Sequence, residues 1–254
     1  MEGELIRASS PEEALAMKNN ESAFFAGGTG IGYKDSGLKA NRWILIPEIS
    51  GIREIKTEDG LIRIGAMVSF TQALEDSAVP SYLKEALRFC GSLQKRNQAT
   101  VGGNIASRRC DSYLIPALLA SGARICLLAK EGTQTIGIEQ YVDEPDRYRD
   151  ALITAVYVKP DSAVSILSKR YANTVESHAY LTLSMGREGD DYRIGLAIKG
   201  SGLFHPDIMN WGIAWKKADV QDDMFGSEEY KRYLTQVTLE TMYEKLGGEG
   251  GSAS

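Results

Sequence analysis

The sequence is poor in cysteine and histidine, two of the residue types that ligate metal ions. It holds three cysteines, Cys90, Cys110 and Cys126, and two histidines, His178 and His205. The cysteines lie too far apart for a zinc knuckle or for the closely spaced thiolates of an iron–sulfur cluster. An odd number of cysteines without a secretion signal indicates free thiols in a reducing compartment. We therefore expect no metal site, and we expect the protein in the cytoplasm.

The sequence also lacks long apolar runs and an excess of positive charge. No stretch approaches the roughly 20 apolar residues that a membrane span needs, and the opening "MEGELIRASS" lacks the apolar core of a signal peptide. The formal net charge of −5 disfavours nucleic acids and anionic membranes as partners. With 254 residues, 43% hydrophobic and 25% charged, the chain has the composition of one large or two modest globular domains.

What the sequence does have, ahead of its Gly/Ser-rich tail, is two glycine pairs, each between an apolar segment and a polar residue. The first lies in "FFAGGTG", Phe24 to Gly30, and the second in "RNQATVGGN", Arg96 to Asn104. Consecutive glycines accept positive φ and carry no Cβ, so several backbone N–H groups can converge on a phosphate. We expect both segments to be loops that could share a pyrophosphate. The plain alternative is two ordinary turns.

Neither segment is a common nucleotide-binding motif. No Gly-Lys-Ser/Thr follows either glycine pair, which excludes a Walker loop. Neither segment reads GxGxxG, the fingerprint of a Rossmann nicotinamide site. Spacing alone therefore leaves open whether the two segments bind a ligand.

Short helices and strands alternate over the first 160 residues. Ser10, Pro11 and Glu13 are typical of a helix start, and the helix should run to about Asn20. Ser69 with Gln72 predicts a second capped helix start. We expect strands in "SAFFAGGTG", "RWILIPEI", "GLIRIG" and "ALITAVYV", and helices in "PSYLKEALRFCGSL" and "LIPALLAS".

The composition changes after Pro160, where β-rich segments follow. "AVSILSKRYA" and "HAYLTLSMGREGDDYRIGLAIKG" predict strands, with a polar turn at Gly189 to Asp191. We expect a mixed α+β part at 1–160, with subdomains at about 1–50 and 51–160, followed by a small sheet and helix at 161–246. The Gly/Ser-rich residues 247–254 are expected to form a disordered tail.

The segment "SEEYKRYLTQVTLETMYEKL" predicts a terminal helix. Helical spacing predicts that its inward residues are Tyr230, Tyr233, Leu234, Val237 and Thr241. The same spacing turns Lys231, Arg232 and Glu240 outward.

The two glycine segments and their surroundings resemble the FAD-binding subunit of molybdopterin-containing dehydrogenases and hydroxylases, of the xanthine dehydrogenase and carbon monoxide dehydrogenase type. "RN-x-x-TVGGN" is specific, and "GLIRIGAMVSF", "PALLASGARI" and "SEEYKRYLTQV" extend the resemblance to residues 1 to about 246. The resemblance implies an α+β fold. In it, a two-part FAD-binding domain of the PCMH (vanillyl-alcohol-oxidase-like) type precedes a C-terminal domain of the CO dehydrogenase flavoprotein type.

The resemblance also implies FAD contacts at individual residues. The first loop resembles one that wraps the pyrophosphate, and Ser107 stands where the family has a small hydroxylated residue against the cofactor. Ile153 matches an apolar residue on the ring system, and Lys169 matches a basic residue that reaches the flavin edge. The implied set is Ala26, Gly27, Gly28, Thr29, Gly30, Ile31, Thr100, Gly102, Gly103, Asn104, Ser107, Asp111, Tyr113, Ile153 and Lys169.

The chain departs from the family pattern after the second loop. The family usually has an aspartate three residues before the proline that is Pro116 here, whereas this chain has Tyr113 at that position. Asp111 could substitute for the aspartate, and Tyr113 either stacks on a ring of the cofactor or packs in the core. Arg108 and Arg109 replace small residues. They could pair with phosphate, form a subunit contact or lie in a solvated turn.

The resemblance implies an electron-transfer role. In such enzymes a molybdenum subunit oxidises a heterocycle or aldehyde, electrons pass through iron–sulfur clusters, and FAD delivers them to an acceptor, often NAD. This chain has neither cluster cysteines nor a molybdopterin signature. Partner 2Fe–2S and molybdopterin subunits would therefore carry those groups, in a dimer of heterotrimers. We expect no proton-transferring catalytic residue in this chain. Two alternatives are a flavin-free scaffold or assembly subunit and an FAD enzyme that acts on its own substrate.

Overall fold

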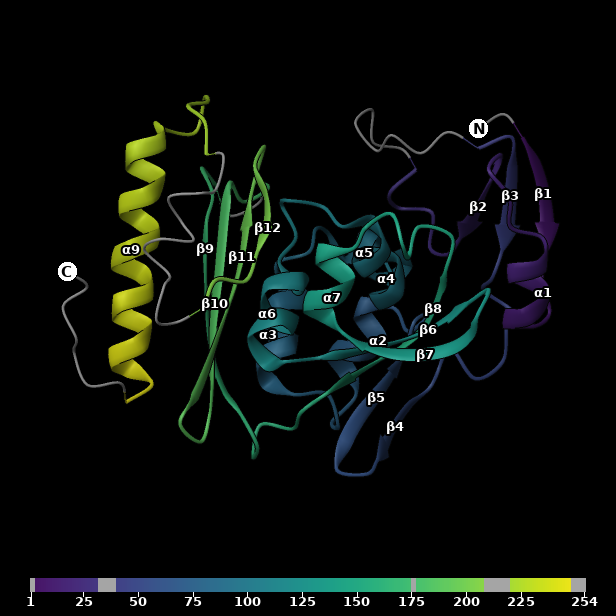
Figure 1. Ribbon diagram of the computed structural model, residues 1–254, viewed down its shortest axis with the longest axis horizontal. Helices are drawn as coiled ribbons and strands as arrows, with labels where there is room; N and C mark the ends of the chain where they lie inside the picture. Colours follow the sequence, from purple (N-terminus) through teal and green to yellow (C-terminus); the bar gives the residue numbers. More distant parts are fainter. Residues whose placement is uncertain (1–2, 32–39, 175–176, 208–219, 248–254) are drawn as a thin grey trace. The chain divides into compact units, whose positions relative to one another are not determined.

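The structure is a computed structural model of the chain (Figure 1). The residues that it describes are 3–31, 40–174, 177–207 and 220–247. Expectations for the tail at 247–254 therefore fall almost wholly outside the described residues.

The chain divides into two compact units, each built from several sequence segments. Unit 1 comprises Met1–Val79, Cys90–Ser107 and Ala123–Val158. Unit 2 comprises Pro80–Phe89, Arg108–Gly122 and Lys159–Ser254. Two segments that come earlier in the sequence, Pro80–Phe89 and Arg108–Gly122, thus belong to the same unit as the residues after 158. The linear domain boundaries expected from the sequence stay a prediction, while the mixed α+β character is confirmed.

The first sheet of unit 1 is small and parallel. Its order is β1-β3-β2, and its strands are β1 (Glu4–Arg7), β2 (Ser22–Phe25) and β3 (Arg42–Leu45). Helix α1 (Pro11–Ala16) connects β1 to β2, and the Ser10 side chain accepts the amide of Glu13 as predicted. The helix ends before Asn20 because the amide of Asn19 donates to the hydroxyl of Ser22 at 2.8 Å, a local bond that competes with the helix.

The second sheet of unit 1 is antiparallel and has five strands. Its order is β4-β5-β8-β6-β7. The strands are β4 (Ile55–Glu58), β5 (Leu61–Gly65), β6 (Arg124–Ala129), β7 (Gly132–Gly137) and β8 (Leu152–Val158). The helices of this part are α2 (Phe70–Glu75), α4 (Leu93–Gln98), α5 (Val101–Ser107) and α7 (Ile138–Asp143). The predicted capping box of Ser69 and Gln72 is present at α2.

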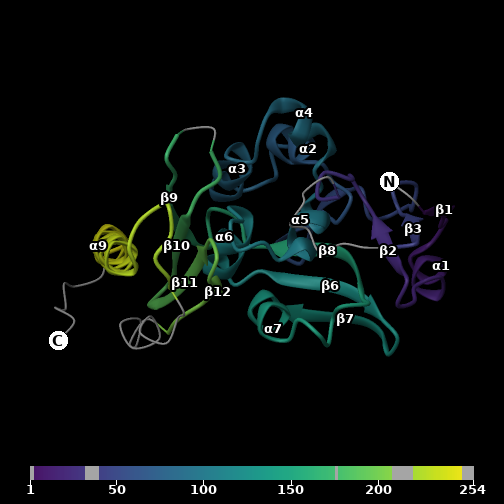
Figure 2. The same cartoon turned by 90° about the horizontal axis from the view of Figure 1, so that it is seen from above.

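Unit 2 is a four-stranded antiparallel sheet with helices on both faces (Figures 1 and 2). The sheet order is β12-β11-β10-β9, with strands β9 (Ser165–Tyr171), β10 (Leu181–Glu188), β11 (Asp191–Ile198) and β12 (Gly202–Phe204). Helices α3 (Ser81–Arg88) and α6 (Leu114–Ser121) cover one face, and α9 (Glu228–Lys245) covers the other. Glycines in the strands allow α6 to approach closely, since an ideal Cβ at Gly195 would lie 2.2 Å from the carbonyl oxygen of Pro116.

Helix α9 turns a different face to the sheet from the one that the sequence predicts. Its buried residues are Lys231, Thr235, Thr238, Leu239 and Met242. Tyr230, Tyr233 and Val237 are instead exposed, and of the predicted inward residues only Leu234 packs against the core. Lys231 is inward because its ammonium group is bonded to Asp223 at 2.8 Å. The spacing of apolar residues carries no information about such an ion pair. A prediction from that spacing therefore places lysine outward and tyrosine inward.

Candidate functional site

The first glycine segment forms a turn after β2 in unit 1. Gly28 has a φ of +71°, in the left-handed region that favours glycine. The amide of Ile31 donates to the carbonyl oxygen of Gly28 at 3.2 Å. Within the described part of the chain, none of the four amides from Gly27 to Gly30 has a hydrogen-bond acceptor. The turn therefore presents a run of unused donors.

The second glycine segment is not the loop that the sequence predicts. Val101–Ser107 form the short helix α5, and both glycines lie in its first turn without positive φ. Thr100 precedes this turn and caps it, because its hydroxyl accepts the amide of Gly103 at 3.1 Å and its carbonyl accepts that of Asn104 at 3.0 Å. The Ala-Thr-Val step predicts a strand end because Thr and Val favour strands. Here threonine serves as a helix cap instead.

The two glycine segments lie against each other in unit 1. An ideal Cβ at Gly27 would lie only 1.7 Å from the carbonyl oxygen of Gln98, the last residue of α4. An ideal Cβ at Gly103 would lie 3.8 Å from the Cβ of Ala26. Folding therefore brings the segments together, and glycine at position 27 is what allows the backbones to approach so closely.

Gly102 fixes the second segment to the end of β5. Its amide donates to the carbonyl oxygen of Ala66 at 2.8 Å, and an ideal Cβ at Gly102 would lie 2.5 Å from the Ala66 Cβ. The amide of Val101 likewise donates to the carbonyl of Val68 at 3.0 Å. A side chain at position 102 would separate these backbones, so this glycine is required by close packing and not by a turn.

Two further predicted residues belong to unit 1. Ser107 ends α5, and its hydroxyl donates to the carbonyl oxygen of Asn104 at 2.6 Å. Ile153 lies in β8 opposite Leu127 and is 5% exposed. The structure thus shows both side chains in contacts within unit 1.

Asp111 is the buried acid of unit 2. Arg109 donates to both carboxylate oxygens at 2.7 Å, and Nδ1 of His178 lies 3.4 Å from Oδ2. Burial raises the pKa of Asp111, whereas the bonds and charge of Arg109, with His178 and Lys199 nearby, lower it by more. The pKa of Asp111 therefore lies below its ordinary value, and the group is a carboxylate at neutral pH. This grouping could not be predicted from the sequence because His178 is remote from Asp111 in the chain.

Tyr113 lies in the interior of unit 2. Its ring is 6% exposed and lies 6.0 Å from the ring of Phe89, with the guanidinium of Arg170 at 5.5 Å from its centroid. Its hydroxyl accepts the amide of Ala179 at 2.9 Å. These contacts favour the packed-core interpretation of Tyr113 over stacking on a cofactor. Lys169, in contrast, is exposed on β9.

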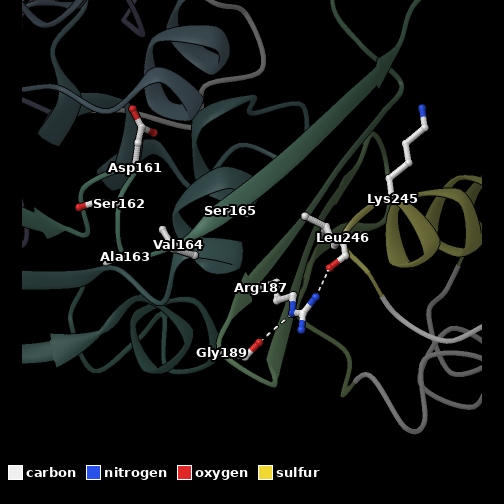
Figure 3. A pocket seen from close by; sticks show the side chains of 9 residues that line it. All are labelled: Asp161, Ser162, Ala163, Val164, Ser165, Arg187, Gly189, Lys245 and Leu246. Atoms are coloured by element: carbon white, nitrogen blue, oxygen red, sulfur yellow. Dashed lines mark hydrogen bonds between the residues drawn. The ribbon is translucent and has the colours of Figure 1, made fainter.

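Unit 2 also contains a pocket of about 370 Å³ (Figure 3). It is lined by the Asp161–Ser165 segment, Arg187, Gly189, Lys245 and Leu246. Arg187 donates to the carbonyl oxygens of Gly189 and Leu246, so its guanidinium ties the turn after β10 to the end of α9. No residue of the predicted FAD set lines this pocket.

The part of the chain that the structure describes holds neither a cluster of metal ligands nor a helix suited to span a membrane. There, no three His, Cys, Asp or Glu side chains come close enough together to hold a metal ion. None of the described helices is both long and apolar enough to cross a membrane.

Comparison with known proteins identifies the relatives of this chain. Residues 1–160 match the family model described as the FAD binding domain in molybdopterin dehydrogenase. The chain is 31% identical to "Uncharacterized protein YgfM" of Escherichia coli (strain K12), over 98% of each chain. It is 29% identical to the nicotinate dehydrogenase FAD-subunit of Eubacterium barkeri, over 56% of this chain and 51% of that relative. Carbon monoxide dehydrogenase from Hydrogenophaga pseudoflava shares the fold, with a TM-score of 0.78, 17% identity and coverage of 96% of each chain.

Proposed function

The chain belongs to the family of FAD-binding domains in molybdopterin dehydrogenases, and from this premise we propose that it is the electron-transfer subunit of a molybdenum hydroxylase complex. It is an oxidoreductase subunit, and FAD is its cofactor. When bound, FAD supplies a carrier that accepts electrons singly and passes them on as a pair. The role of this chain is to bind and orient that carrier.

The contact between the two glycine segments carries the proposal. A diphosphate needs several N–H donors in one place with no side chain between them. The four unused amides from Gly27 to Gly30 meet the donor requirement, and a Cβ at Gly30 would find no atom within 4 Å, so there is space beside them. The first turn of α5 lies next to this turn through Gly103 and Ala26. The residues present therefore fit the group.

We assign the diphosphate to unit 1 and leave the remaining contacts as predictions. The residues proposed to hold it are Ala26, Gly27, Gly28, Thr29, Gly30, Ile31, Thr100, Gly102, Gly103 and Asn104. Contacts of Ser107, Asp111, Ile153 and Lys169 with FAD stay predictions. For Tyr113 we propose a structural role, since its ring and hydroxyl are both engaged within unit 2.

The partners are proposed on the same basis. A relative is named as the FAD-subunit of nicotinate dehydrogenase, which supports a chain that works beside other subunits. We propose an iron–sulfur subunit of the 2Fe–2S type and a molybdopterin subunit as those partners, with NAD as a possible acceptor. The PCMH-type description of the FAD-binding domain, the dimer of heterotrimers and a cytoplasmic location also stay predictions.

An absorption spectrum of the purified full-length protein tests this function. We expect a flavin spectrum that stays with the protein through gel filtration and is released as free FAD on denaturation. Purification from the native host should also yield molybdenum and iron in the same complex. A protein that stays colourless after incubation with FAD would contradict the proposal and support the flavin-free scaffold. Flavin without molybdenum or iron would support an FAD enzyme with its own substrate.

A further inference from the structure

We propose that the outer face of α9 binds a segment of a partner subunit that presents apolar side chains bordered by lysine or arginine. The outer face is defined here by Tyr230, Tyr233 and Val237 with Glu229, Glu240 and Glu244. The inference rests on the proposed function in taking the partner to be a subunit of that complex. It adds where on this chain the partner docks and what chemistry it must offer.

The first observation is the exposure of three large apolar side chains on one helix. Tyr230, Tyr233 and Val237 are 46%, 63% and 40% exposed. Their spacing of three and four residues places them in a row on one side of the helix. Half of the large apolar side chains that are exposed in the described part of the chain belong to this row, so they are not scattered singly.

The inner face of α9 fixes this exposure. Lys231 is 1% exposed, and its ammonium group donates to the carbonyl oxygen of Gln221 and to Asp223, each at 2.8 Å. Thr238 hydrogen-bonds Tyr171 of β9 at 2.6 Å. If the helix rotated so that the tyrosines became buried, Lys231 and Thr238 would lose these hydrogen-bond partners. A buried cation without its partner is strongly disfavoured. The inner contacts therefore keep Tyr233 and Val237 outward, while Tyr230 is about half exposed and its side chain also hydrogen-bonds Tyr180.

The charges around the row select the kind of partner. Glu229, Glu240 and Glu244 share the outer face by helical spacing. Arg232 lies at its border and is paired with Glu228 at 2.7 Å. A second copy of this chain would set glutamates against glutamates, and an anionic membrane would also be repelled. Charge complementarity therefore favours a partner segment with lysine or arginine.

The aromatic residues of the row suit such a contact. Tyrosine offers a large apolar ring and a hydroxyl on a side chain with few rotatable bonds, and it is enriched among residues that dominate binding energy. Tyr233 is the most exposed of the three and lies between the other two along the helix. It is therefore the expected centre of the contact.

Site-specific photo-cross-linking tests the inference. Benzoylphenylalanine replaces Tyr233 in the full chain, co-expressed with its partner subunits. The control places the same group at Leu93, which is 61% exposed in unit 1. We expect the Tyr233 position, and not the Leu93 position, to capture a partner-subunit peptide with apolar residues bordered by lysine or arginine. Capture of a second copy, of another segment of this chain or of an acidic peptide would overturn the inference.

Paired variants provide a second readout. Tyr233→Ala with Val237→Ala should weaken binding of the partner subunit at least about tenfold while FAD content stays at the wild-type level. Leu93→Ala should change neither. Glu240→Lys should also weaken binding, and this loss should shrink at high salt. If the complex forms with wild-type affinity in all variants, the docking face is wrong while the proposed function stands. If the wild-type chain recruits no partner subunit, the proposed function and this inference both fail.

Discussion

Gly27 faces the carbonyl oxygen of Gln98 so closely that an ideal Cβ on Gly27 would lie 1.7 Å from that oxygen. This single contact joins the turn after β2 to the end of α4, immediately before the second glycine segment. It explains why the first glycine of the pair cannot carry a side chain although its φ is not positive. The arrangement of the proposed diphosphate site depends on it.

Substituting Gly27 by alanine should destabilise unit 1. The new Cβ meets a backbone oxygen, which cannot rotate away, so the two segments must separate. Overpacking of this kind costs about 1–3 kcal/mol of the free energy of unfolding. Urea unfolding followed by circular dichroism measures the loss. Gly30→Ala is the matched control, because its Cβ enters open space, and it should stay within about 0.5 kcal/mol of wild type. Equal stability of the two variants would contradict the close contact.

Removing the hydroxyl of Tyr113 should affect stability and leave flavin binding unchanged. In Tyr113→Phe the buried amide of Ala179 loses its acceptor, which costs about 1–3 kcal/mol. Thermal unfolding and FAD titration separate the two effects. Tyr157→Phe is the control, since the Tyr157 hydroxyl makes only an exposed 3.5 Å contact with Glu58 and its loss should have little effect. A large loss of FAD affinity with normal stability would show that Tyr113 contacts the cofactor instead.

The Asp111–Arg109 pair should make stability depend on acidic pH. The pKa of Asp111 in the folded protein is lowered: burial raises it, but Arg109 lowers it by more. A carboxyl whose pKa is lower in the folded protein than in the unfolded chain stabilises the folded state at pH values above its unfolded-state pKa, which is about 3.9. This stabilisation is lost as pH falls through the folded-state pKa. Wild type should therefore lose unfolding free energy as pH falls below about 4, and Asp111→Asn should lose less.

Unfolding measured at several acidic pH values checks this dependence. Asp190→Asn is the control, because the Asp190 side chain is fully exposed at the turn after β10, and it should follow the wild-type curve. If the unfolding free energy of Asp111→Asn falls with decreasing pH as steeply as that of wild type, the Asp111–Arg109 pair does not account for the acid sensitivity.

The strands and capped helix starts were largely accessible from the sequence because they depend on local signals. Ser10 and Ser69 cap the helices as predicted, and the turn at Gly189 joins β10 to β11. The conformation of the second glycine segment is ambiguous in the sequence because the same Thr-Val step suits a strand end or a helix cap. Only the hydrogen bond from Gly103 to Thr100 decides between them. The closeness of the two glycine segments could thus be predicted, but not the local conformation of the second.

The inward face of α9 was beyond prediction for a different reason. It is set by Asp223, which binds Lys231 from outside the helix. The interleaving of segments in the two units also depends on contacts between distant residues, such as the approach of Gly195 to Pro116. Such long-range contacts leave no mark in local periodicity.

The affinity for FAD of Gly30→Val tests the central claim most directly. Gly30 is a better position for this test than Gly103. An ideal Cβ at Gly103 would lie 2.8 Å from the Thr100 hydroxyl and would disturb the helix cap, whereas an ideal Cβ at Gly30 meets no protein atom within 4 Å. Gly137→Val in the same unit is the control, since its Cβ meets only the end of the Glu139 side chain. Titration of the apo-proteins with FAD should show at least about tenfold weaker binding for Gly30→Val and wild-type binding for Gly137→Val. Wild-type affinity in Gly30→Val would contradict a diphosphate held at this turn.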